Sequence, residues 1–152
     1  MTNEEKILHL EQKLKNLQMY YAAAIADSVS RYGNEGVLDK ITRQKKSEQM
    51  KSGSDTATRL GVKEPKQVFE KIQDLYGCAS WVCNDTEDGF EAITTNCMLC
   101  AISKRMGPHS PCQIYCLSPI EAMIKAIMPN INFTVTDTLW SSDKCRISVK
   151  FE

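Results

Sequence analysis

The chain has 152 residues, which is enough for one domain with a hydrophobic core. Its 19 basic and 19 acidic side chains cancel at pH 7, so it lacks the positive charge typical of proteins that bind nucleic acid. No apolar run reaches the about 18 residues of a membrane-spanning helix, and the charged start does not resemble an export signal. We therefore expect a single cytoplasmic domain over residues 1–152, with no nucleic acid and no membrane as partner.

The first half of the chain is predicted to be helical. Apolar residues recur with the period of a helix over residues 3–32, and Gly33 is expected to end this helix. We expect it to bury one face in the core and to offer a seam for a homodimer. A second helix is predicted over residues 34–50, a break with a short helix over residues 51–61, and a further helix over residues 65–76.

The second half of the chain changes to a strand pattern. Alternating, β-prone runs form two hairpins, residues 78–84 with 90–96 and residues 132–140 with 144–151. The order is therefore a helical half over residues 1–77 and a hairpin–helices–hairpin half over residues 78–152. This order predicts an α+β fold with a four-stranded, mostly antiparallel sheet.

The stretch between the two hairpins carries the chemistry. It holds four of the seven cysteines and one of the two histidines. We expect Asn96 to cap a helix over residues 97–106, which Gly107 ends. Ser110-Pro111 is expected to start a second short helix, and Ser118-Pro119 a third with a capping box.

These helices arrange the cysteines in two pairs. Cys97 and Cys100 lie three residues apart, and Cys112 and Cys116 lie four apart, so each pair occupies one helix face. We expect the sharp turn between the helices to fold the two pairs toward each other. His109, which lies in this turn, is then expected between them.

Three interpretations of the cluster stay open. Cys97, Cys100, Cys112 and Cys116 are soft ligands that suit an iron–sulfur cluster or zinc. Alternatively, Cys97 or Cys112 acts as a nucleophile, because a helix N-terminus lowers the pKa of a thiol, and His109 serves as base. The third interpretation is that these cysteines pack as small hydrophobic residues.

The layout of the chain also resembles a known family. Its first half carries RYGNEGVLDKI (residues 31–41) and SDTATRLG (54–61), Cys97 and Cys112 follow, and the last hairpin contains TLWSSDKCRISV (138–149). This resembles the L-2-amino-thiazoline-4-carboxylic acid hydrolase-like family, which is related to the 4-vinyl-reductase-like ligand-binding domains of bacterial sensors.

The last hairpin departs from the family pattern. The usual ending is Gly-Asp-x-x-Cys-x-Phe, and of these residues only Cys145 is matched. Ser141 and Ser142 stand in the Gly-Asp positions, and Ile147 stands in the position of the Phe. The related sensor domains can bind zinc with cysteines near this hairpin. Of those cysteines, only Cys145 is present in this chain.

The resemblance implies a ligand pocket between sheet and helices. It also implies hydrolytic opening of a cyclic amidine to a carbamoyl-cysteine, or action on a related small sulfur- or nitrogen-containing substrate. Cys97 or Cys112 would attack the amidine carbon, or a metal held by the four thiolates would polarise the ring, while His109 moves a proton. The alternative is a non-catalytic, sensor-type module that binds a metal or a small ligand.

Overall fold

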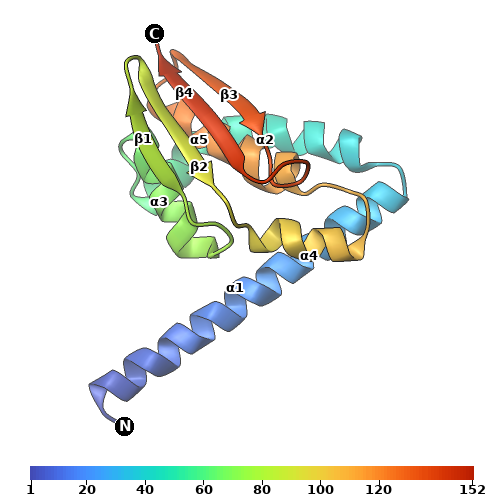
Figure 1. Ribbon diagram of the computed structural model, residues 1–152, viewed down its shortest axis with the longest axis vertical. Coiled ribbons are helices and arrows are strands. Elements are labelled where there is room, and N and C mark those ends of the chain that lie inside the picture. Colours follow the sequence, from blue (N-terminus) through green and yellow to red (C-terminus); the bar gives the residue numbers. More distant parts are fainter.

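The computed structural model describes residues 1–152 and confirms the predicted α+β fold (Figure 1). Helices dominate the first half of the chain and two hairpins the second, as expected. The elements are α1 (Asn3–Asn34), α2 (Leu38–Leu60), α3 (Pro65–Tyr76), β1 (Val82–Thr86), β2 (Gly89–Thr94), α4 (Met98–Met106), the π-helical segment η1 (Gln113–Leu117), α5 (Ser118–Ile127), β3 (Ile131–Asp137) and β4 (Cys145–Phe151).

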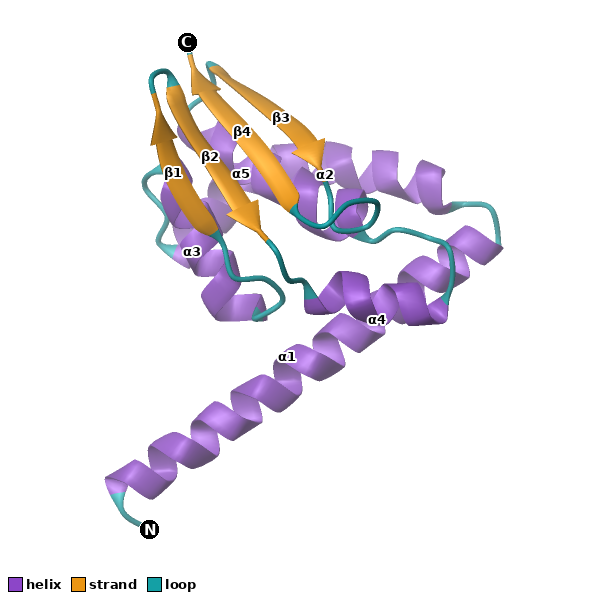
Figure 2. Ribbon diagram, in the orientation of Figure 1, coloured by secondary structure: helices purple, strands orange, loops and turns teal.

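The four strands form one antiparallel sheet in the order β1-β2-β4-β3. Both predicted hairpins are present, and the second strand of each lies at the centre of the sheet. Alternation along β2 and β4 turns Phe90, Ala92, Ile147 and Val149 inward, where all four are fully buried. Helices α2, α3 and α5 cover this inner face, as Figure 2 shows, and close the main core against it.

The long helix α1 confirms the predicted helix, but only its second half is packed. Thr2 and Glu5 form the capping box that starts it. Its buried side chains begin at Ala22, so the prediction of one buried face along the whole helix is wrong for the first half. No helix of this fold combines the length and the apolar composition that crossing a membrane requires.

Helix α2 runs without interruption through the predicted break, so that prediction is wrong. Gly53 lies inside the helix and is buried. A Cβ at this position would lie 2.5 Å from the carbonyl oxygen of Ala122 in α5. The glycine therefore serves the close approach of two helices, and this packing overrides its local tendency to end a helix.

The second and third helices predicted after the turn are joined into one. Ser118 has helical dihedral angles and its hydroxyl accepts a hydrogen bond from Gln113 at 2.7 Å, so the predicted capping box at Ser118 is wrong. Pro119 follows, and a proline inside an α-helix lacks an N–H and crowds the carbonyl one turn earlier. The wider π-turn of η1 makes room for this ring, and such turns are frequent at functional sites.

Candidate functional site

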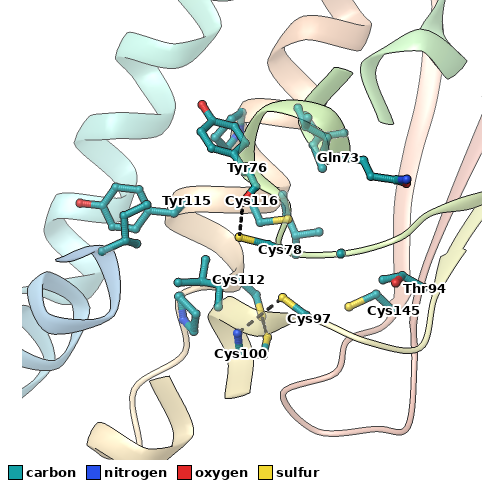
Figure 3. A pocket seen from close by; sticks show the side chains of 18 of the residues that line it. Gln73, Tyr76, Cys78, Thr94, Cys97, Cys100, Cys112, Tyr115, Cys116 and Cys145 are labelled. Atoms are coloured by element: carbon teal, nitrogen blue, oxygen red, sulfur yellow. Dashed lines mark hydrogen bonds between the residues drawn. The ribbon is translucent and has the colours of Figure 1, made fainter. Parts of the chain in front are cut away.

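A cavity of about 280 Å³ lies between the sheet and the helices, and its wall is rich in sulfur. All four cysteines predicted to converge do line it. Cys78 and Cys145, which sequence reasoning did not place there, line it as well (Figure 3). Only Cys83, on β1, lies elsewhere, so the cavity collects six of the seven cysteines of the chain, all of them free thiols.

Cys97, Cys100 and Cys112 form the tightest part of this cluster, which we call the thiol triad. Cys97 is the N-cap of α4, and its Sγ accepts the backbone N–H of Cys100 at 3.5 Å. The Sγ atoms of Cys100 and Cys112 lie 3.4 Å apart. Figure 3 shows the three sulfurs next to one another at one side of the cavity.

The predicted cap of this helix, Asn96, is one residue too early. Its amide oxygen and its carbonyl both accept from the buried Thr94 hydroxyl, at 3.2 and 3.0 Å. The turn from β2 into α4 is thus closed by Thr94 and Asn96, and Cys97 takes the capping position. The N–H of Met98 also donates to the carbonyl of Cys78 at 2.8 Å, which ties the start of α4 to the loop before β1.

The surroundings of Cys97 favour its thiolate. The Cys100 side chain is the largest cause that lowers the pKa of Cys97, and the backbone amides of Cys100 and Leu99 add to this effect. Together they outweigh burial and lower the pKa of Cys97 from 9.0 to about 6. Cys97 is therefore more readily ionised than an ordinary thiol.

Cys112 competes with Cys97 for the same donor. The Cys100 thiol also lowers the pKa of Cys112, with help from the Ser110 hydroxyl and the charge of Lys104. Cys100, whose own pKa is raised by these two neighbours and by burial, has only one proton to donate. We assign the stable thiolate to Cys97, because it alone accepts the amides at the start of α4.

The remaining sulfurs of the cavity stay protonated at neutral pH. Burial raises the pKa of Cys78 and of Cys145 to about 11 each, and it raises that of Cys116 well above the usual range. Cys145 Sγ also accepts the backbone N–H of Leu139 at 3.1 Å. These three thiols therefore form the weakly polar wall around the single thiolate.

Three polar residues of α2 line the cavity, and two of them, Lys45 and Gln49, have long side chains that could bind a ligand. Lys45 is the one basic residue that lines it, and its Nζ lies 5.5 Å from the ring centroid of Tyr115. One turn further, Gln49 donates to the carbonyl of Ile114 at 3.1 Å, while its buried Oε1 has no hydrogen-bond partner. A ligand that offers both an anion and an N–H donor would satisfy these two side chains.

His109 is not brought to the thiols. It is not among the residues that line the cavity, and its imidazole lies against Gly33 at the end of α1, where a Cβ would collide with the ring. No group of three or more His, Cys, Asp or Glu side chains is arranged so that it could hold a metal ion. The geometry thus joins the predicted thiols without the predicted base.

Four of the site residues were missed or misinterpreted in the sequence. Cys78 precedes the first hairpin and Cys145 opens the last strand, and only the order of the sheet brings them to the cavity. The alternation of β4 does place Cys145 on the inner face, which is a signal that could have found it. Lys45 and Gln49 lie in the second predicted helix, over residues 34–50, and neither was singled out in the sequence as a site residue.

The fold and the cavity define a small α+β protein with an internal cavity lined by six free cysteines. The family model for L-2-amino-thiazoline-4-carboxylic acid hydrolase matches residues 12–147, which is most of the chain. The chain therefore belongs to this family, as its layout suggested. Comparison with curated proteins and with solved structures gives no match.

Proposed function

We propose that this protein is a thiol-dependent hydrolase that opens a small cyclic amidine bearing a carboxylate, such as L-2-amino-thiazoline-4-carboxylate. The family match supports this reaction class. The observation that carries the proposal is the position of Cys97, which lines the cavity as the partly exposed N-cap of α4, where its surroundings lower the pKa of its thiol. A thiolate is the form of cysteine that attacks carbon.

Accessibility favours Cys97 over its neighbours as the nucleophile. Cys100 and Cys112 are only 5% and 8% exposed, whereas Cys97 is partly exposed. Cys100 then acts as the proton donor that holds Cys97 ionised, and Cys112 packs behind Cys100 at 3.4 Å. His109 has no step in this proposal, because it lies outside the cavity.

The polar groups of α2 suit the substrate. Lys45 pairs with the carboxylate, and the free Oε1 of Gln49 accepts an N–H of the amidine. Most of the remaining lining is apolar, with 18 hydrophobic residues among 26. A cavity of about 280 Å³ suits a compact ligand of this kind rather than a peptide.

The proposed chemistry has two steps. The Cys97 sulfur bonds to the amidinium carbon, and the bond from this carbon to the ring sulfur breaks, so that the ring sulfur leaves as a thiolate. Water then delivers its hydroxyl to the same carbon and one proton to the departed sulfur. The bond to Cys97 breaks, which restores its thiolate, and collapse to the carbonyl releases one proton to solvent. The product is an N-carbamoyl-cysteine, which is the substrate plus one water.

The proposal needs a reducing compartment. All seven cysteines are free, and the Cys100 and Cys112 sulfurs are close enough for an oxidant to join them. A disulfide there would remove the donor that ionises Cys97. We therefore propose a cytoplasmic location, where thiols are kept reduced.

The test is hydrolysis of L-2-amino-thiazoline-4-carboxylate by the purified, reduced protein, followed by mass spectrometry of the product. Cys97→Ser should lose turnover, because a serine hydroxyl is not ionised at neutral pH. Cys83→Ser is the matched control, since Cys83 is a free cysteine outside the cavity, and it should keep full activity. Turnover by Cys97→Ser at the wild-type rate would refute the proposal.

A second candidate is a non-catalytic module that binds a small ligand or a metal, and the mainly apolar lining favours the small ligand. An iron–sulfur cluster or zinc on Cys97, Cys100, Cys112 and Cys116 belongs to this candidate. Because no three of these side chains are arranged as a metal site in this structure, this candidate requires the four cysteines to turn toward one point. Stoichiometric metal in anaerobically purified protein, with no turnover of the amidine, would support this candidate over the hydrolase.

A further inference from the structure

The first half of α1 is a helix without a partner in its own chain. Residues 3–17 are all exposed, and Figure 1 shows this part of the helix projecting away from the rest of the molecule. The first tether is Gln18, whose amide donates to the carbonyls of Asp74 and Leu75 at 3.1 Å each. An isolated helix of about 15 residues is marginal in water, so this segment needs stabilisation from elsewhere.

The projecting segment carries an apolar stripe in the order of a coiled coil. Ile7, Leu10, Leu14 and Leu17 are spaced by three, four and three residues, which are positions a, d, a and d of a heptad. They are 55%, 62%, 46% and 67% exposed. At 3.6 residues per turn, the centre of the stripe lies about a quarter of a turn from the centre of the face that α1 buries in its own chain, which consists of Ala22, Ile25, Ala26 and Val29.

The charges beside the stripe select one arrangement of two copies. Lys6 and Lys13 occupy g positions, and Glu4 and Glu11 occupy e positions. In a parallel pair, Lys6 faces Glu11 of the second copy, whereas an antiparallel pair sets lysine against lysine and glutamate against glutamate. Ile7 at a and leucine at both d positions also favour a parallel pair of two strands.

We propose that residues 7–17 of α1 form a parallel, two-stranded coiled coil with a second copy of this chain. The occupant is not a membrane surface, because residues 3–17 carry three acidic and three basic side chains rather than a cationic face. The proposal does not depend on the hydrolase chemistry. Since two heptads are short, the dimer is expected to dissociate on dilution.

The first test is the mass of the full-length protein in solution by analytical ultracentrifugation over a range of concentrations. The expected result is a mass near twice 17.2 kDa at high concentration. Leu14→Lys should shift the protein to the monomer mass. Leu8→Lys is the matched control, because Leu8 is 65% exposed on the outer face of the helix, and it should stay dimeric. A monomer at every concentration, or equal effects of the two variants, would overturn the proposal.

The second test reads the direction of the helices. Leu10→Cys at position d should form a disulfide with the same residue of the second copy under mild oxidation, identified by peptide mass spectrometry. Lys15→Cys, on the outer face, should not. If the dimer forms disulfides only through native cysteines such as Cys83, and none through position 10 of the Leu10→Cys variant, the parallel arrangement is excluded. Circular dichroism of each variant verifies that the fold is kept.

Discussion

The substitution Cys100→Ala tests whether one buried thiol controls the ionisation of its neighbour. The Cys100 thiol is the largest cause of the lowered pKa of Cys97, which is about 6 instead of 9.0. Alanine removes this donor and leaves the backbone amides of residues 99 and 100 in place. We therefore expect the pKa of Cys97 to rise by more than about 1 unit. Cys100→Ser keeps a donor and should give a smaller rise.

The size of the pKa shift of Cys97 decides which quantity to measure. With a pKa of about 6, about 90% of Cys97 is thiolate at pH 7, against about 1% at a pKa of 9.0. A less basic thiolate is also a weaker nucleophile, and for three units this costs about 16- to 32-fold in intrinsic rate. The net gain at pH 7 is then only about 3- to 6-fold, so the rate at a single pH is a poor test. The midpoint of the pH–rate profile is the better test, because it reports the pKa of Cys97 directly.

The assay is alkylation by iodoacetamide over a range of pH, quantified for each cysteine peptide by mass spectrometry. In the wild-type protein, Cys97 should titrate near pH 6, while Cys78 and Cys145 should titrate near pH 11. Cys83→Ala serves as control and should leave the midpoint of Cys97 unchanged. A midpoint near 9 in the wild type, or an unchanged midpoint in Cys100→Ala, would refute the reasoning.

Two further predictions concern α2. Lys45→Met should raise KM for the carboxylate-bearing amidine about tenfold with little change in kcat, whereas the control Lys40→Met should leave KM unchanged. Both variants should hydrolyse 2-amino-thiazoline, which lacks the carboxylate, equally well. An equal loss of activity of Lys45→Met on both substrates would contradict the assigned ion pair. Gly53→Ala should lower the free energy of unfolding by about 1–3 kcal/mol in urea denaturation, because the added methyl meets the Ala122 carbonyl, and a gain in stability would show that helix propensity outweighs this contact.

Much of the fold could be predicted because its signals are local. Pro65 and Gly77 bracket α3, and turn residues bracket both hairpins, so these elements follow from short stretches of sequence. Gly53 shows where local signals fail. Gly53 and the serines on either side of it indicate a break in the helix. The helix continues because α5 packs against it, and that contact joins residues far apart in the chain.

The candidate site, like the fold, could be predicted only where its signals are local. The convergence of Cys97, Cys100 and Cys112 could be predicted, because two short helical segments joined by one turn carry them. His109 could not be excluded from the sequence, since its place against Gly33 depends on where α1 ends relative to the turn. Lys45 could not be assigned either, because which face of α2 meets the cavity is set by its packing on α5.

The most direct test of the central claim is the mass of the protein during turnover. Reduced protein is mixed with excess L-2-amino-thiazoline-4-carboxylate, quenched in acid within seconds and analysed intact and as peptides. The account predicts an adduct equal to the whole mass of the substrate, since ring opening expels no atoms, located on Cys97 and absent from Cys97→Ser. Hydrolysis that proceeds with no adduct on Cys97, or with an adduct on another cysteine, would contradict it.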